Sequence, residues 1–286
     1  MRVLVTGARG QVGTELTTAL QNLEYVTAVL ATSRESLDFT VRQSVFDCVK
    51  DFSPSVIFHC GAMTNVDLCE DDTDRAFLVN GIGTRFVKQA ARAASAKVIY
   101  LSSDYVFDGK ANKPINEWSP TGPISVYGAS KLAGEQELES CDIIVRTSWV
   151  MGVYGKNILK TILRLANGSG EVKFVNDQLG SPTVVSDLVT VLIQLMENDE
   201  SGTFHVSNSG SVSWYELTRF VFEVTGHDPA RVLPIRSFEL DASRKAPRPG
   251  YSVLDNAALR LSGYPTMPDW RTSVESLCAE LSKSPL

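Results

Sequence analysis

The chain has 286 residues, of which 43% are hydrophobic and 21% are charged. These fractions are ordinary for a folded globular protein and exclude a disordered chain. The net charge of -6 disfavours nucleic acid and anionic lipid as partners. Residues 2–5 already form a strand-like run, and the sequence holds no uninterrupted apolar stretch of membrane-spanning length. We therefore expect a cytoplasmic protein that is not attached to a membrane.

Cysteine and histidine do not follow the spacing of a disulfide framework or a metal site. The five cysteines form no CxxC pair, and the three histidines lie far apart. We predict reduced thiols, no metal and no catalytic histidine. The sequence leaves open whether the protein is a monomer or a homodimer, and whether Glu15 helps a divalent ion to bridge subunits.

The first half of the chain alternates short runs rich in Val and Ile with longer amphipathic segments. This pattern is typical of βαβ units and predicts an α/β fold with a doubly wound parallel sheet of the Rossmann type. The nearly continuous apolar character of the runs indicates strands covered on both faces. The expected strands are 2–6, 25–31, 55–59, 97–101 and 142–147, and the expected helices are 12–22, 41–51, 73–94 and 125–139.

Beyond residue 148, helical segments are separated by turns rich in Gly, Pro, Asn and Ser. We predict an NADP-binding domain over residues 1–148 and a smaller, mainly substrate-binding domain over residues 149–286. A segment near 172–210 is expected to return to the sheet. The expected helices here are 156–167, 184–197, 214–225 and 270–282, and the expected short strands are 172–175 and 203–206.

A glycine-rich turn follows the first strand directly. Gly7, Gly10 and Gly13 are spaced three residues apart and stand immediately before a helix. Glycine permits a tight turn and a close approach of the backbone to phosphate, while the helix N-terminus offers unpaired N–H groups. Such turns often serve only as turns, but the strand before it and the helix after it favour a dinucleotide pyrophosphate site.

The ends of the second and third strands bear on the choice of cofactor. NAD-specific sites usually carry an acidic residue after the second strand, whereas this chain has Arg34 there. A guanidinium suits a 2′-phosphate, so NADPH is the expected cofactor, with NADH as the alternative. Arg34 could instead be a solvated surface residue, and Asp38 could approach the adenine end. Residues 60–64, which include Ala62, would let the cofactor lie against the sheet edge.

Tyr127 and Lys131 stand four residues apart on one face of a predicted helix. A nearby ammonium is expected to lower the pKa of the phenol and tune it for proton transfer. This spacing alone is weak, but Ser103 closes the fourth strand at the same sheet edge. In the predicted mechanism Tyr127 protonates the developing alkoxide, Ser103 hydrogen-bonds it, and Lys131 holds the tyrosine and the cofactor ribose. Asn80 could join a proton relay or make a structural hydrogen bond.

With these residues in hand, the chain resembles the extended short-chain dehydrogenases that act on nucleotide sugars, and among them the dTDP-4-dehydrorhamnose reductases. The resemblance spans nearly the whole length. It is carried by the turn Thr6–Gly13, the stretch Ser102–Gly109 (S-S-D-Y-V-F-D-G), the Tyr127 and Lys131 pair, R-T-S-W at 146–149, D-Q-L-G-S-P-T at 177–183 and H-V-S-N at 205–208.

The resemblance implies reduction of the 4-keto group of dTDP-4-dehydro-β-L-rhamnose to dTDP-L-rhamnose. It also implies that the C-terminal part holds the dTDP moiety, with Arg248 as a contact. The family commonly has threonine where Ser103 stands, which keeps the hydroxyl. The cofactor contacts implied by position are Gly10, Gln11, Val12, Asp38, Ala62, Met63 and Thr64, and the sugar contacts are Ser103, Asp104, Tyr127 and Trp149.

Among related functions, a dehydratase is disfavoured, because the dehydratase pattern has a glutamate after the aspartate and this chain has Tyr105 after Asp104. Two other functions stay open at this stage. An epimerase would recycle its hydride on tightly held NAD. A non-catalytic regulatory subunit that binds NADP would also share the fold, since fold does not prove function.

Overall fold

The computed structural model describes residues 1–240 and 244–283. Its centre is a parallel sheet of six strands in the order β10-β5-β4-β3-β1-β2. β2 is added on one side of β1, whereas β3 and the strands after it are added on the other side. The carboxyl ends of β1 and β3 therefore form the switch point of this parallel sheet. The strands are β1 Arg2–Thr6, β2 Ala28–Ala31, β3 Val56–His59, β4 Lys97–Ser103, β5 Ile143–Thr147 and β10 Gly202–His205.

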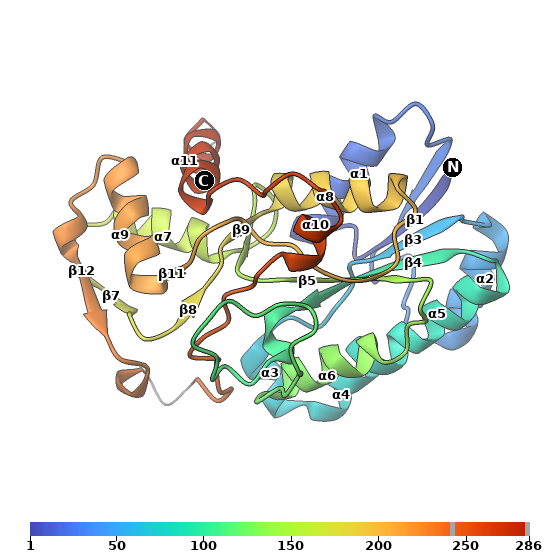
Figure 1. Ribbon diagram of the computed structural model, residues 1–286, viewed down its shortest axis with the longest axis horizontal. Coiled ribbons are helices and arrows are strands. Elements are labelled where there is room, and N and C mark those ends of the chain that lie inside the picture. The colour runs from blue at the N-terminus through green and yellow to red at the C-terminus, as the bar shows by residue number, and fades with distance from the viewer. Residues whose placement is uncertain (241–243, 284–286) are drawn as a thin grey trace.

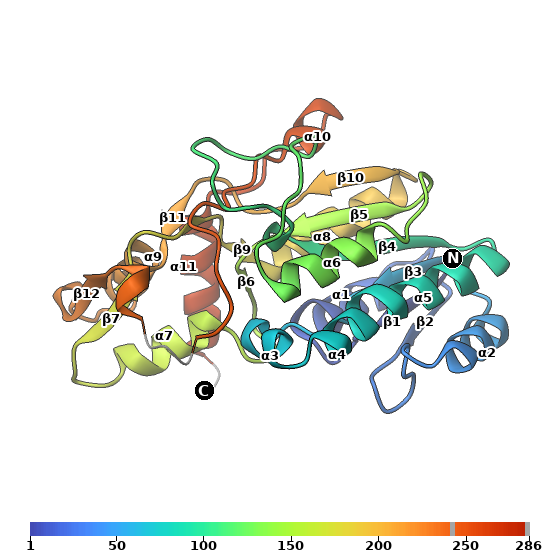
Figure 2. The same ribbon diagram turned by 90° about the horizontal axis from the view of Figure 1, so that it is seen from below.

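Helices cover both faces of this sheet (Figures 1 and 2). Successive side chains of a strand point to opposite faces, so Val3 and Val5 of β1 join one apolar cluster and Leu4 joins another. The first cluster is closed by α1 and α8, and the second by α2 and α5. The sheet helices are α1 Gln11–Gln21, α8 Val185–Glu197, α2 Arg42–Phe52, α4 Thr73–Phe77, α5 Gly83–Ala93 and α6 Val126–Glu135.

One predicted helix differs from the structure. The segment 73–94 is expected as a single α-helix, but a π-helical turn over Leu78–Ile82 separates α4 from α5. Apolar periodicity hardly changes across one widened turn, so the sequence pattern does not reveal it. Asn80 lies inside this turn, and its buried side chain bonds to the loop after β3.

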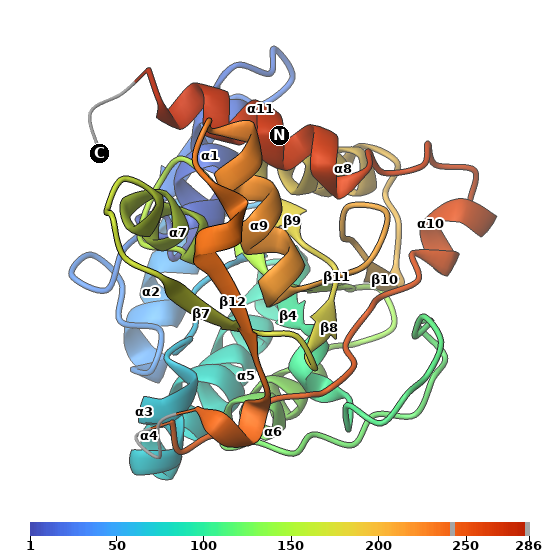
Figure 3. The ribbon, with the colours of Figure 1, turned by 90° about the vertical axis from the view of Figure 1, so that its left-hand side faces the viewer.

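The C-terminal part builds a second apolar core beside the sheet, around Ile162, Leu217 and Trp270. Figure 3, viewed from that side, places α7, α9 and the β7–β12 pair in front of the sheet. Its elements are α7 Ile158–Ala166, α9 Trp214–Val224, α11 Trp270–Leu281, β7 Val172–Val175 and β12 Val232–Ile235. Shorter elements are β6 Val150–Met151, β8 Leu179–Gly180, β9 Thr183–Val184, β11 Val212–Ser213, α3 Val66–Asp71, α10 Ala257–Leu261 and the 3-10 turns Asp104–Val106, Pro229–Arg231 and Ser237–Glu239.

The segment 172–210 divides between the two parts of the molecule. β10 pairs in parallel with β5 in the main sheet, and α8 packs against α1. β7 pairs instead with β12, away from that sheet. The boundary after residue 148 stays a prediction. Across residues 1–240 and 244–283, no helix combines the length and the apolar character needed to span a bilayer.

Candidate active site

The glycine turn lies at the switch point between β1 and β3. Gly7 has a φ of +66°, and a Cβ there would stand 2.7 Å from the backbone nitrogen of Gly61. A Cβ at Gly13 would stand 2.3 Å from the carbonyl oxygen of Gly7. Gly10 is the N-cap of α1, and within the described chain no side chain caps that first turn. The turn therefore has the close backbone approach and free N–H groups that a dinucleotide pyrophosphate requires.

The residues predicted for the adenosine end lie just beyond β2. Arg34 is exposed, and its neighbour Glu35 pairs with Arg9 across 2.8 Å. Asp38 is half-buried and accepts hydrogen bonds from the backbone and the hydroxyl of Thr40 at 2.9 and 2.6 Å. The Thr40 hydroxyl lowers the pKa of Asp38, which keeps this carboxylate charged. Contact of Arg34 or Asp38 with a cofactor stays a prediction.

The side chain of Asn80 forms hydrogen bonds with the loop that follows β3. Its Oδ1 accepts a hydrogen bond from Met63 N at 2.8 Å, and its Nδ2 donates to Met63 O at 3.1 Å and to Ser130 Oγ at 2.9 Å. These bonds join the loop holding Ala62, Met63 and Thr64 to α6. Of the two roles considered for Asn80, the structural one matches this bonding.

Tyr127 and Lys131 occupy the first two turns of α6, which begins after the cap residue Ser125. The Lys131 ammonium is buried, donates to Leu101 O at 2.7 Å and lies 4.0 Å from the centre of the Tyr100 ring. Burial lowers the pKa of Lys131 to about 7, although the negative charge of Glu135 opposes that change. The pKa of Lys131 therefore lies near neutral pH.

The pKa of Tyr127 does not behave as the sequence argument expects. Burial raises it above the ordinary value of 10, and the nearby Ser103 hydroxyl only partly opposes the rise. The negative charge of Asp104 adds to the rise, and the Lys131 ammonium donates to the carbonyl oxygen of Leu101 rather than to the phenol. The phenol consequently stays protonated, which is the state that a proton donor needs.

Ser103 and Asp104 lie at the end of β4, beside Tyr127. Ser103 Oγ donates to Asp104 Oδ1 at 2.9 Å and accepts from Tyr105 N at 3.2 Å. Asp104 is buried, and its Oδ2 finds no hydrogen-bond partner among the described residues. Burial raises the pKa of Asp104 to about 6, against the hydrogen bonds of Ser252 and Ser103. Tyr105 stands edge-on to the Tyr127 ring, with centroids 5.4 Å apart.

Arg248 is ion-paired within the protein. Its Nη2 lies 2.7 Å from Asp67 Oδ2, and Asp67 also accepts from Ala246 N at 3.0 Å. The pair ties the proline-rich loop around 246–250 to α3, which follows the loop after β3. A phosphate that used Arg248 would have to share it with Asp67, so its role toward dTDP stays a prediction.

Trp149 follows β5 with a left-handed backbone, φ +46°. Its indole stacks on that of Trp214, with centroids 3.5 Å apart and planes 8° apart. A sugar could therefore contact only the part of Trp149 that stays exposed. Contact of Trp149 with the sugar stays a prediction.

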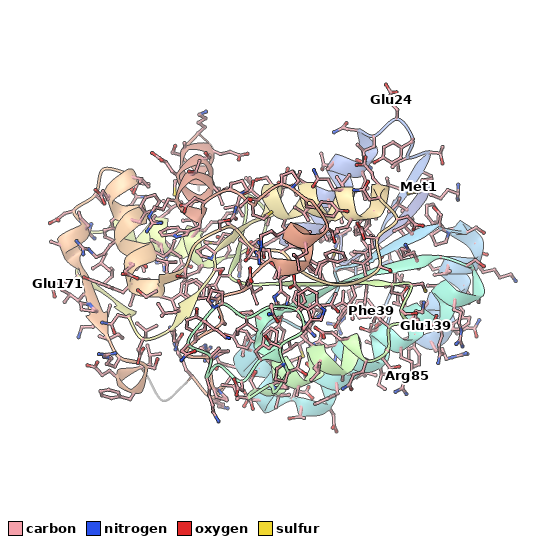
Figure 4. All side chains as sticks on the ribbon, viewed as in Figure 1. Met1, Glu24, Phe39, Arg85, Glu139 and Glu171 are labelled. Carbon is pink, nitrogen blue, oxygen red and sulfur yellow. The ribbon has the colours of Figure 1, made fainter. Side chains whose placement is uncertain are left out.

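Acidic groups gather at two places away from Tyr127. Glu139, Cys141 and Asp142 lie close enough to hold an ion, but Lys88 Nζ already pairs with Asp142 at 2.7 Å. Figure 4 shows Glu139 at the right of the molecule, opposite to Glu171. Glu15 is partly buried, and burial together with the nearby charges of Glu280 and Asp187 raises its pKa. All five cysteines are described as free thiols.

Several neighbours of the site escape the sequence analysis. Trp214, Asp67 and Ser252 reach it from segments distant in sequence, and local pattern gives no signal for them. Tyr105 is named in the sequence analysis, but its edge-on contact with the Tyr127 ring follows only from the structure.

A glycine turn and the Ser103, Tyr127 and Lys131 group at the carboxyl edge of a six-stranded parallel sheet define a short-chain dehydrogenase of the extended type. Residues 1–283 match the family model described as RmlD substrate binding domain, and the chain belongs to this family.

Similar proteins share nearly the whole chain. The dTDP-4-dehydrorhamnose reductase of Bacillus anthracis, solved in complex with NADP, superposes with a TM-score of 0.91 at 39% identity and covers 98% of this chain and 99% of its own. The dTDP-4-dehydrorhamnose reductase of Streptomyces griseus is 39% identical over 96% of this chain and 91% of its own. The dTDP-4-keto-6-deoxy-D-glucose reductase of Streptomyces niveus is 38% identical over 96% and 95%.

Proposed function

We propose that the protein reduces the 4-keto group of dTDP-4-dehydro-β-L-rhamnose to give dTDP-L-rhamnose, with NADPH as the reductant. The observation that carries this proposal is the placement of Tyr127 beside Ser103, and on one helix with the buried Lys131, at the sheet edge where the glycine turn lies. The names of the relatives support a dTDP-linked 4-keto sugar, and the NADP complex of one of them supports the cofactor.

The residues divide the chemistry between them. NADPH, held by the glycine turn and by Arg34, supplies a hydride to the carbonyl carbon. Tyr127 donates its proton to the developing alkoxide, and Ser103 donates a hydrogen bond to the same oxygen. To do so, the Ser103 hydroxyl turns away from Asp104, which it bonds in this structure. Lys131 then stabilises the phenolate left behind.

The particular sugar is the finer part of the proposal. Relatives of nearly equal identity are named for dTDP-4-dehydrorhamnose and for dTDP-4-keto-6-deoxy-D-glucose, and both names describe a 4-ketone on a dTDP-linked 6-deoxysugar. Ser103 and Tyr127 act on the ketone oxygen that the two share. We infer the rhamnose substrate from the family resemblance. A cytoplasmic location and a monomeric or homodimeric state also stay predictions.

The test is a reductase assay with purified protein. We expect stoichiometric oxidation of NADPH with dTDP-4-dehydro-β-L-rhamnose, slower oxidation of NADH, and dTDP-L-rhamnose as the product. dTDP-glucose, which lacks the ketone, serves as the control and should consume no cofactor. An epimerase would change the sugar without net NADPH consumption, and a regulatory subunit would bind NADP without turnover. Either result would contradict the proposal.

A further inference from the structure

Two tryptophans far apart in sequence form one stacked pair beside the candidate active site. Trp149 follows β5, and Trp214 is the first residue of α9. Their rings lie 3.5 Å apart and are nearly parallel, at 8°. Both side chains are half-buried, so part of the pair remains accessible. Trp149 also holds a φ of +46°, a conformation that residues with a Cβ rarely adopt.

A glycine completes the contacts of Trp149. A Cβ at Gly180 would lie 2.4 to 2.6 Å from three adjacent indole atoms, Cε2, Cζ2 and Nε1. No backbone fits between two rings that are 3.5 Å apart, so Gly180 touches Trp149 away from the Trp214 face. Gly180 in β8 pairs with Val212 in β11, two residues before Trp214. This strand pair therefore brings both contacts to Trp149 together.

The pair lies at the catalytic edge of the sheet. Trp149 stands two residues after Thr147, whose register partner across β4 and β5 is Ser103. Gly180 follows Leu179, whose carbonyl accepts a hydrogen bond from Ser252 N at 2.8 Å. Ser252 also lies near Asp104 and opposes the rise of its pKa. Trp149, Gly180 and the Ser103 end of β4 consequently share one wall of the site.

We propose that Trp214 and Gly180 are positioning residues that hold the Trp149 indole in place as a wall of the sugar site. This inference rests on the proposed function. The left-handed backbone directs the indole, the Trp214 ring supports one of its faces, and the missing Cβ at Gly180 leaves it room. A wall that is already ordered loses little conformational freedom when the sugar binds, which favours affinity. Neither positioning residue is expected to touch the reacting atoms.

Four variants test the proposal. Trp214→Ala removes the support, and Gly180→Ala drives a methyl group into the indole. The matched controls are Trp118→Ala, at a tryptophan that is 67% exposed, and Gly170→Ala, where a Cβ meets nothing within 4 Å. We expect both test variants to raise the KM for the dTDP-4-keto sugar about tenfold, with kcat within about twofold and NADPH affinity unchanged. The controls should behave as wild type.

Two further measurements separate positioning from a general structural role. Trp214→Phe keeps an aromatic face and should restore most of the sugar affinity that Trp214→Ala loses. Stacked indoles couple their transitions, so near-ultraviolet circular dichroism should lose a paired signal in Trp214→Phe and keep it in Trp118→Ala. An unchanged KM in Trp214→Ala and Gly180→Ala would overturn the proposal, as would an equal loss of NADPH and sugar affinity.

Binding of dTDP-rhamnose, measured by calorimetry, distinguishes this inference from the proposed function. If wild type binds the sugar nucleotide but reduces no keto sugar, the proposed function fails while the positioning of Trp149 is still tested by the dissociation constants of the variants. If wild type binds no dTDP-sugar, both proposals fail.

Discussion

The proposed cofactor side of the site, around the glycine turn, and the proposed sugar side, around Trp149 and Arg248, are built in different ways. On the cofactor side, adjacent strands bring short loops together, and the contacts are backbone contacts such as those between Gly7, Gly13 and Gly61. On the sugar side, side chains from separate segments meet, as in the Trp149 and Trp214 stack or the Arg248 and Asp67 ion pair. The cofactor side therefore depends on local sequence, whereas the sugar side depends on how the C-terminal part packs.

A buried chain of hydrogen bonds supports the cofactor side. Thr84 Oγ1 donates to Asn80 O at 2.7 Å, so its oxygen accepts from His59 Nε2 at 3.2 Å, and His59 Nδ1 then accepts from Thr6 Oγ1 at 2.7 Å. This assigns the neutral tautomer with its proton on Nε2. The cofactor side thus rests on a buried network of hydrogen bonds, whereas the sugar side rests on packed side chains.

The two sides meet at Tyr127, so its loss should have the largest effect. Tyr127→Phe removes the proton donor and should lower kcat by about 10²–10⁴-fold, the usual contribution of a general acid. The affinity for NADPH, measured by fluorescence titration, should change little because the glycine turn is intact. Turnover at the wild-type rate would remove Tyr127 from the mechanism.

A buried ion pair between Glu135 and Arg146 connects the helix that carries Tyr127 to the strand that precedes Trp149. Arg146 Nη2 lies 2.6 Å from Glu135 Oε2, both side chains are buried, and the pair joins α6 to β5. Arg146→Met leaves a buried carboxylate without its partner and should reduce the free energy of unfolding by about 3–5 kcal/mol. Urea denaturation measures this.

The control for that experiment is Glu35→Gln in the exposed pair with Arg9, which should leave stability unchanged within error. Replacing both buried partners, as in Glu135→Leu with Arg146→Met, should recover much of the lost stability. A single Arg146→Met variant as stable as the surface variant would contradict the account.

The scaffold under the cofactor side predicts an acid sensitivity. Burial, assisted by the charge of Lys131, lowers the pKa of His59 from 6.5 to about 3. Below pH 6.5 the unfolded chain binds a proton at His59, whereas the folded chain binds it only near pH 3. The contribution of His59 to stability is therefore complete above pH 6.5 and decreases as the pH falls below that value. The stability advantage of wild type over His59→Gln should shrink by about 2 kcal/mol between pH 7.5 and pH 5. An advantage independent of pH would show that His59 does not titrate this way.

The smallest effect is expected at the adenosine end, where Arg34 is exposed. Arg34→Ala should weaken NADPH binding roughly tenfold, or by about 1.4 kcal/mol, because the 2′-phosphate loses a donor. NADH binding, measured in parallel, supplies the control and should not change. Equal effects on both cofactors would place the 2′-phosphate elsewhere.

The same contrast explains what the sequence can and cannot predict. The glycine turn and the five strands of the first half follow from local patterns, and each expected strand overlaps an observed one. The π-helical turn around Asn80 is not predicted, because it widens one turn without altering the apolar face. Arg248 and Asp67 are 181 residues apart, and only the folded chain brings them together.

The pKa values needed the structure as well. The Tyr127 and Lys131 spacing indicates a phenol next to an ammonium, but not that burial opposes the charged form of both groups. Sequence therefore proposes the reacting groups, while their protonation states depend on how deeply the rest of the chain covers them.

The central claim is a hydride passed from NADPH to a sugar ketone that Tyr127 protonates. Its most direct test uses NADPH with deuterium at both C4 positions of the nicotinamide, followed by mass spectrometry and NMR of the sugar nucleotide. The account predicts one deuterium at C4 of dTDP-L-rhamnose with the wild-type protein. An unlabelled product, an epimerised keto sugar, or no conversion in the presence of bound NADPH would contradict it.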